Sequence, residues 1–407
     1  MMENKSVSRR ELFAHGGKLA VAAGAATYLI APGRAMGSEC RGAGQLGLVG
    51  TDHVGLTVPD INQAVEWFED VMGAVAPLTF GPISDPTGTL MHDLLDVDPR
   101  AVIKQITVLR IGHSANIELF EYSAPGQRRD HPRNSDWSGH HVAFYVTDID
   151  EAVEYMQSRG VEKFLGPLPI TDGPAAGQTI NYFRTSFGTF IELISYPKGM
   201  AYERTTRQRL WSPKYNGKRS EVTKVPGLLG IDHIGITVPD IARATSWFKD
   251  VLGFIEPLTF GPLSDPVGTF IQDVVGTHPR AVIEQITEGR GGNGPNVELF
   301  QYTAPDQDRT FRRNSDWGGH HIAFYVRHID EAVEYLERKG VPKLLGPFAV
   351  TEGPAAGQTI NYFKAPFGFI ELISYPHGMA YEETAPIKLW NPNDNKRRGA
   401  AGHRRPT

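Results

Sequence analysis

Apolar and polar positions alternate along the chain in short runs that predict strands, with one helical stretch between them. Residues 53–58 alternate in this way, as a half-buried strand does. Pro59 ends the run, and Asp60 is a good N-cap for the apolar residues that then recur at helical spacing as far as Gly73. Further strand-like runs lie at 75–80, 102–109 and 116–122. The pattern predicts a module of one strand, one helix and three strands.

The same order returns in a second module. Residues 141–146 form its first predicted strand, and a helix follows from Asp148 to Gly160. Strand-like runs then lie near Phe164, at 179–184 and at 189–195. Each module predicts a four-stranded sheet that is too small to bury its own face. Two such sheets are therefore expected to pack around a shared cleft.

The whole arrangement is repeated once along the chain. GTDHVGLTVPDI at 50–61 returns as GIDHIGITVPDI at 230–241, and GHHVAFYV at 139–146 returns as GHHIAFYV at 319–326. A repeat of this length indicates a duplicated domain rather than a solenoid. The prediction is four modules in an α+β fold, with domains at 48–202 and 228–381, a linker at 203–227 and a basic tail at 382–407. Whether modules pair within a half or across halves is left open.

Composition narrows the class of protein. The chain is 40% hydrophobic and 21% charged, which is typical of a soluble globular protein. A formal net charge of −5 argues against nucleic acid as a partner. The single cysteine, Cys40, excludes an intramolecular disulfide framework and a thiolate metal cluster.

The first 35 residues predict export. Arg9-Arg10 precede an apolar run at 19–31 and a small-residue cleavage pattern at 33–35, as in a twin-arginine signal peptide. The run is shorter than the roughly 20 residues that span a bilayer, so no stable membrane insertion is expected after processing. These features predict the twin-arginine export machinery as a partner and a periplasmic or secreted location.

Histidine and glutamate recur at matching strand positions, and these residues predict metal binding. Glu118 lies between apolar neighbours on a predicted central strand, where an unpaired carboxylate is costly without a cation. Nitrogen and oxygen donors of this kind suit Zn, Ni, Co, Mn or Fe(II). The expected quartets are His53, Glu118, His141 and Glu192, and His233, Glu298, His321 and Glu371. If modules pair across halves, the quartets would exchange members but would still number two.

Other repeated polar residues are candidates for substrate binding. They are Arg100, Tyr182, Arg280 and Tyr362, together with Gln178 and Gln358. Asn134, Asp136, Asn314 and Asp316 are further candidates, and every residue of this group is equally consistent with a role in loop structure. His140 and His320, one residue before a predicted ligand, are expected on the opposite strand face.

The sequence resembles the vicinal oxygen chelate superfamily, which includes glyoxalase I, methylmalonyl-CoA epimerase, extradiol dioxygenases and bleomycin-resistance proteins. The resemblance covers 48–196 and 228–375. Within the superfamily, the sequence is most similar to the valiolone epimerase-like branch, on the basis of the motifs DHVGLTVPDI, HPRAVI, RNSDW, GHH and ISYPHGMAYE. The resemblance implies βαβββ modules that pair around a metal held by the first, fourth, fifth and eighth strands.

The resemblance also implies a choice of chemistry. Four protein ligands leave room for two adjacent substrate oxygens, as in the isomerases, epimerases and glyoxalases of the superfamily. The expected activity is a metal-dependent epimerase, isomerase or lyase that acts through an enediolate on a small, sugar- or cyclitol-like hydroxy-carbonyl compound. The candidate catalytic bases are the metal-site glutamates, Glu118, Glu192, Glu298 and Glu371. An Fe(II) ring-cleaving dioxygenase and a non-catalytic binder that sequesters a small molecule are the alternatives, and a homodimer is compatible with each.

Overall fold

The computed structural model describes residues 46–215, 223–265 and 267–393. The predicted leader at 1–35 and most of the predicted basic tail lie outside these residues. Among the described helices, none combines the length and apolar character that a membrane crossing requires.

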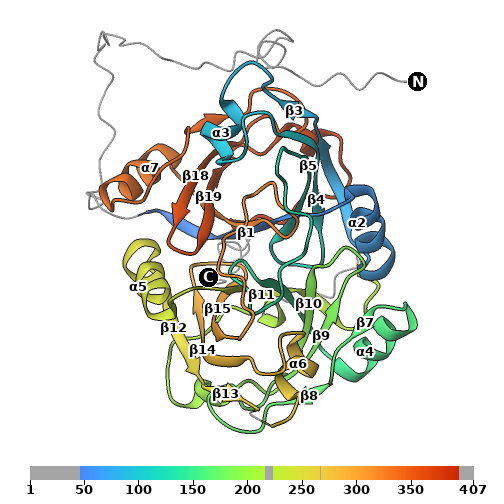
Figure 1. The fold of residues 1–407 in the computed structure, drawn as a ribbon. Helices are drawn as coiled ribbons and strands as arrows, with labels where there is room; N and C mark the ends of the chain where they lie inside the picture. The colour runs from blue at the N-terminus through green and yellow to red at the C-terminus, as the bar shows by residue number, and fades with distance from the viewer. Residues whose placement is uncertain (1–45, 216–222, 266, 394–407) are drawn as a thin grey trace, which may run out of the picture.

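The described strands form two curved sheets, and each sheet contains strands from both halves of the chain. In Figure 1 the upper sheet combines the blue and teal start of the chain with its orange and red end. We call it sheet 1, with the order β17-β18-β19-β16-β1-β5-β4-β2. Its strands are β1 (Leu48–Thr57), β2 (Val75–Phe80), β3 (Ile83–Ser84), β4 (Val102–Arg110), β5 (Asn116–Ser123), β16 (His320–Val326), β17 (Phe348–Ala349), β18 (Thr359–Ala365) and β19 (Gly368–Ser374).

Sheet 2 is built from the middle of the chain and has the order β12-β14-β15-β11-β6-β10-β9-β7. It combines the second module of the first half with the first module of the second half. Its strands are β6 (His140–Val146), β7 (Glu162–Lys163), β8 (Leu168–Pro169), β9 (Thr179–Arg184), β10 (Phe190–Ser195), β11 (Leu228–Thr237), β12 (Ile255–Phe260), β13 (Leu263–Ser264), β14 (Val282–Arg290) and β15 (Asn296–Thr303).

The seam of each sheet joins the two halves. In sheet 1, β1 runs antiparallel to β16, with His53 opposite Ala323 and Gly55 opposite His321. In sheet 2, β11 runs antiparallel to β6 in the same register. Pairing therefore occurs across halves, which answers the question that the repeat left open. Among the residues that the structure describes, each histidine and glutamate quartet takes members from both halves.

Helices cover the outer faces of the sheets and enclose a core between them. Asp60, Asp148 and Asp240 accept hydrogen bonds from backbone amides three residues onward, as N-caps do. The buried residues of these helices share one core with outward-facing strand residues of both sheets, including Val54 and Ile234. The longer helices are α2 (Ile61–Trp67, continued by a π-turn, Phe68–Met72), α4 (Ile149–Ser158), α5 (Ile241–Leu252) and α7 (Ile329–Arg338).

Two short helices were not expected from the sequence. They are α3 (Leu90–Leu95) and α6 (Phe270–Val275). Each is shorter than two turns, so its apolar residues do not repeat often enough to produce a helical pattern. Both lie in the connection between the second and third long strands of their module, where α3 helps to form the wall of the cavity described below.

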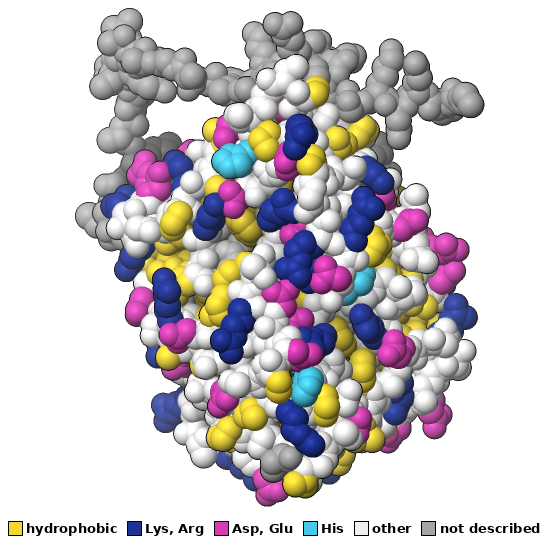
Figure 2. All heavy atoms as spheres, in the orientation of Figure 1, with side chains coloured by type: hydrophobic (Ala, Val, Ile, Leu, Met, Phe, Trp, Pro, Cys, Tyr) yellow, Lys and Arg dark blue, Asp and Glu magenta, His cyan; other side chains and the backbone are white. Residues whose placement is uncertain are grey.

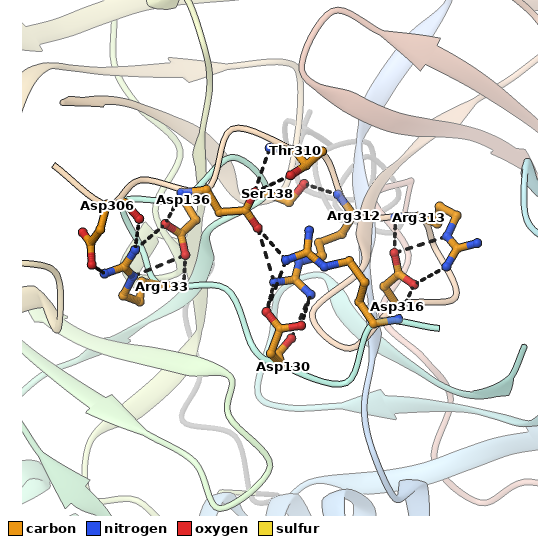
Figure 3. Close-up of polar contacts among 11 residues, drawn as sticks. Asp130, Arg133, Asp136, Ser138, Asp306, Thr310, Arg312, Arg313 and Asp316 are labelled. Carbon is orange, nitrogen blue, oxygen red and sulfur yellow. Dashed lines mark hydrogen bonds and ion pairs between the residues drawn. The ribbon is translucent and has the colours of Figure 1, made fainter. Parts of the chain in front are cut away.

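Loops from the two halves interlock between the sheets (Figure 3). Arg312, whose side chain is 1% exposed, donates to both carboxylate oxygens of Asp130, and Arg133 pairs with Asp136 and Asp306. The Asp136 carboxylate also accepts a hydrogen bond from the backbone amide of Asp308, and the Asp316 carboxylate accepts one from the backbone amide of Arg128. Asp136 and Asp316 thus organise these loops, which was one of the two roles predicted for them.

A tryptophan-bearing arm follows each half, with Leu210-Trp211 after the first half and Leu389-Trp390 after the second. Trp211 exchanges backbone hydrogen bonds with the Asn296 side chain, and Trp390 does the same with Asn116. The two indoles meet edge to face beside Ala115. The arms therefore fasten the carboxyl end of each half onto the sheet that carries its partner module.

Candidate metal centre

Four predicted ligands converge at the seam of sheet 1. His53 and His321 project from adjacent strands, and their Nε2 atoms lie 3.4 Å apart. The parallel neighbours of these strands, β5 and β19, bring Glu118 and Glu371 to either side of the pair. The Oε2 atom of Glu118 lies 3.2 Å from His53 Nε2, and that of Glu371 lies 3.1 Å from His321 Nε2. We call this group site 1.

Site 2 repeats this arrangement in sheet 2. Its members are His141, Glu192, His233 and Glu298. The two imidazole Nε2 atoms are again 3.4 Å apart, and the carboxylate Oε2 atoms lie 3.2–3.4 Å from them. The predicted residues thus form two quartets, each with two members from either half.

The residues present fit a divalent metal ion. The Oε2 atoms of all four site glutamates are buried and have no hydrogen-bond partner, although they are aimed at the histidine Nε2 atoms. Ligand atoms about 2.1 Å from a common cation lie roughly 3.0–3.4 Å from one another, which matches these separations. A buried carboxylate oxygen without a partner is costly, and a shared cation would remove that cost.

Close packing at the seam depends on one glycine in each site. Gly55 lies opposite His321, and a Cβ added to Gly55 would overlap the His321 ring. Gly235 stands in the same relation to His141. A side chain at either position would push the imidazole out of the quartet, so these glycines are part of each site.

Each first-strand histidine is oriented by the aspartate before it. The register slips by one residue between Thr51 and His53, so β1 holds an extra residue there. Asp52 Oδ1 accepts from His53 Nδ1 at 2.9 Å, and Tyr375 donates to Asp52 Oδ2 at 2.5 Å. Such a carboxylate fixes the ring so that Nε2 faces the metal.

Site 2 has the same support. Asp232 accepts from His233 Nδ1 at 3.2 Å, and the hydroxyl of Tyr196 donates to Asp232. None of these four supporting residues was predicted from the sequence. The Asp-His pair repeats in both halves and was a usable signal, but strand alternation alone assigns Asp52 and His53 to opposite faces.

Within each quartet, the neighbouring charges raise the pKa values of the histidines and lower those of the glutamates, against the effect of burial. Burial alone would lower the pKa of His53, but Glu118 and Asp52 outweigh it and hold that pKa well above its ordinary value. Burial alone would raise the pKa of Glu371, but His321 and His53 lower it to about 2. The glutamates therefore stay ionised at neutral pH, and metal binding must displace a proton from His53.

A cavity of about 680 Å³ opens onto site 1. Glu118, Glu371 and Tyr362 line its inner end, and the hydroxyl of Tyr362 lies 3.3 Å from His321 Nε2. Burial and the two carboxylates raise the pKa of Tyr362 well above its ordinary value, so this hydroxyl remains protonated. Gln358 also lines the cavity. Tyr182 lies in the same position beside His141.

The two predicted arginines lie elsewhere. The side chain of Arg100 is 73% exposed and pairs with Asp98, two residues before it. Arg280 donates to the carbonyl of Gly268 and is also exposed. Neither residue is among those that line the cavity at site 1. Their repeated Pro-Arg-Ala-Val-Ile context forms a turn before β4 and β14, and a role of either residue in substrate binding stays a prediction.

His140 and His320 point away from the metal quartets, as strand alternation predicts. Their rings contact each other with centroids 4.6 Å apart, between the two sheets. Burial lowers the pKa of both residues, to about 4 for His320. They therefore pack as neutral rings at the junction of the sheets.

A buried carboxylate beside the quartet distinguishes site 2 from site 1. Glu288 on β14 lies opposite Glu298 and has its Oε1 atom 4.0 Å from His233 Nδ1, whereas sheet 1 has Val108 in the equivalent place. Glu288 Oε1 is buried and has no hydrogen-bond partner. Burial raises the pKa of Glu288 well above its ordinary value. Glu288 was not predicted from the sequence, because the matching position in the first half is apolar.

Glu288→Val is expected to stabilise the metal-free protein by about 1–3 kcal/mol at pH 7, because it removes a buried polar group without a partner. The pKa of Glu288 is higher in the folded state than in the unfolded state. Below the unfolded-state pKa, Glu288 is protonated in both states and burial of its charge costs nothing. As the pH rises above the unfolded-state pKa, the wild-type protein therefore loses stability. The gain over wild type should therefore grow between pH 5 and pH 8 in calorimetric unfolding. Val108→Glu is the mirror control and should destabilise; a gain that does not vary with pH would contradict this account.

Comparison with known proteins places these observations in a family. A family model described as the Glyoxalase/Bleomycin resistance protein/Dioxygenase superfamily matches residues 52–182 and 232–362. A 2-epi-5-epi-valiolone epimerase from an Actinomyces species is 47% identical over 174 residues, which cover 42% of this chain and 93% of that protein.

Solved structures with a similar chain path share little sequence. Glyoxalase I from Zea mays is 14% identical, with a TM-score of 0.48 over 88% of this chain and 97% of its own. A putative dioxygenase from Bacillus subtilis is 12% identical, with a TM-score of 0.49 over 87% of this chain and 95% of its own. These likenesses are too distant to support any inference about activity.

Proposed function

The chain belongs to the Glyoxalase/Bleomycin resistance protein/Dioxygenase superfamily, and we propose that within it this protein is a metal-dependent epimerase or isomerase. Its substrate would be a small molecule with a carbonyl beside a hydroxyl-bearing carbon. Each site would move a proton on the carbon next to the carbonyl. The similarity to a valiolone epimerase favours this class of reaction.

The main support is the presence of two carboxylates in each quartet, one of which is more exposed than the other. The side chain of Glu118 is 11% exposed, and that of Glu371 is 3% exposed. In site 2 the corresponding values are 10% for Glu298 and 3% for Glu192. An ionised carboxylate at the inner end of the cavity is well placed to accept a proton from carbon.

The roles of the residues follow from their positions. His53, His321, Glu118 and Glu371 would hold a divalent cation, which when bound polarises the substrate carbonyl and stabilises developing negative charge. Glu118 would take the proton, since its pKa lies below its ordinary value and it is ionised at neutral pH. Tyr362 remains protonated and belongs to the opposite module, so it could return a proton from another direction. The apolar walls exclude water.

The test is proton exchange in deuterated water. Metal-loaded protein should exchange the proton next to the carbonyl of an α-hydroxyketone, and chelator-treated protein should not, as followed by NMR. The same preparations are given catechols in an oxygen electrode. Metal-dependent oxygen consumption with ring cleavage, and no exchange, would replace the isomerase by the ring-cleaving dioxygenase. Tight binding with neither reaction would leave the sequestering protein.

A further inference from the structure

We propose that the substrate is an uncharged molecule with an apolar body, which carries its two adjacent oxygens at one end. Only one part of this inference, the pair of adjacent oxygens, rests on the proposed function. The apolar body is inferred from the walls of the cavity, and it distinguishes this substrate from a polyol, a sugar or a phosphate ester.

One wall of the cavity is almost wholly apolar. The first module supplies Leu90, Met91 and Leu94 from α3, together with Ile103 and Ile106 from β4. These side chains belong to a buried cluster inside sheet 1 that is separate from the core between the sheets. A substrate that fills this space must therefore place most of its surface against hydrocarbon.

Polar side chains are few in the cavity lining. At the inner end are the carboxylates of site 1 and Tyr362, which are committed to the metal quartet. The others, Thr351, Glu352 and Gln358, belong to one short segment of the second half. Thr79 also lines the cavity, but its hydroxyl pairs with that of Thr107. Hydroxyl groups distributed around a ring would meet hydrocarbon on most sides.

No lysine, arginine or histidine is among the residues that line this cavity. The charged residues in its walls are Glu118, Glu352 and Glu371, and all of them are acidic. Recognition of a phosphate or carboxylate uses cationic donors, most often arginine. On the molecular face in Figure 2, basic and acidic side chains are interspersed, in contrast to the lining of this cavity. An anionic substrate would be repelled there unless the metal neutralised it.

Sheet 2 repeats the apolar wall. Ile271, Val274, Ile283 and Ile286 occupy the places of Met91, Leu94, Ile103 and Ile106, and they form a buried cluster with Tyr182 and Phe300. Both copies therefore keep hydrocarbon at these positions although the residues themselves differ. Two large apolar side chains on neighbouring elements, Leu263 and Phe270, are 40% and 41% exposed.

Three probes, two neutral and one charged, distinguish an apolar substrate from a polyol and from a phosphate ester. They are 2-hydroxyacetophenone, 2,3,4,5-tetrahydroxycyclohexanone and dihydroxyacetone phosphate, which share a carbonyl beside an oxygen-bearing carbon. Binding to metal-loaded wild-type protein is measured by calorimetry. The aromatic ketone should bind at least tenfold more tightly than either of the others, because hydroxyls or a phosphate would lose water without finding partners. Equal or tighter binding of the tetrahydroxy ketone or the phosphate would overturn the proposal, as would the failure of all three to bind.

Wall variants test where the apolar body lies. The double variant Ile106→Thr, Ile286→Thr should weaken binding of 2-hydroxyacetophenone about tenfold in both sites and leave metal content unchanged. The matched double variant Ile106→Leu, Ile286→Leu should stay within about threefold of wild type. If the threonine variant does not fold, the three probes on wild type still decide. Unchanged affinity in a folded threonine variant would contradict the proposed placement.

The two proposals can fail separately. If the aromatic ketone binds tightly but shows no metal-dependent proton exchange, the apolar substrate stands and the epimerase or isomerase fails. If exchange occurs only with the tetrahydroxy ketone, the reaction stands and the apolar substrate is refuted.

Discussion

Replacing Glu118 and Glu298 together by Gln is expected to lower turnover by about two to four orders of magnitude, the range that a positioned general base contributes. The amide keeps the shape of the side chain but cannot accept the proton. Most of the metal should remain, because three ligands of each quartet survive and the amide oxygen is a weak fourth. Steady-state rates and metal content are measured on the same preparations.

The single variants supply the control. Glu118 lies in site 1 and Glu298 in site 2, in different sheets. If both sites are active and independent, Glu118→Gln alone should remove the contribution of site 1 only. A double variant that keeps wild-type turnover would show that neither glutamate is the base.

A fragment of residues 46–215, produced alone, is expected to be a dimer. In the full chain, β1 pairs with β16 and β6 pairs with β11, so the fragment would leave both seam edges without their partners. Two fragments can restore both seams by pairing β1 of each with β6 of the other. Each dimer should then hold two metal ions, as measured by light scattering and metal analysis. A metal-loaded monomer would show that one half can close on itself.

The local elements followed from the sequence because short-range signals define them. Asp60 and Gly73 bound the first helix as predicted, and Gly73 has the left-handed conformation expected at a helix end. β2 and β9 have the predicted limits. The eight histidine and glutamate residues were found because they recur after 179 or 180 residues, and because alternation places them on the concave faces.

The pairing of modules could not be predicted in the same way. β1 and β6 carry nearly the same sequence as β11 and β16, so β1 could pair equally well with β6 or with β16 on the basis of side-chain pattern. What distinguishes them in the structure is long-range: the interlocked loops around Arg312 and Asp130, and the tryptophan arms. Glu288 escaped prediction for the opposite reason, since it breaks the repeat.

The most direct test of two metal centres assembled across halves is the number of ions held per chain at wild-type affinity against a competing chelator. Wild type should hold two. The double variant His53→Ala, His321→Ala empties site 1 and should hold one, whereas His53→Ala, His141→Ala damages both sites and should hold none. If the second variant instead held one ion and the first held none, the quartets would belong to single halves, and the architecture described here would be contradicted.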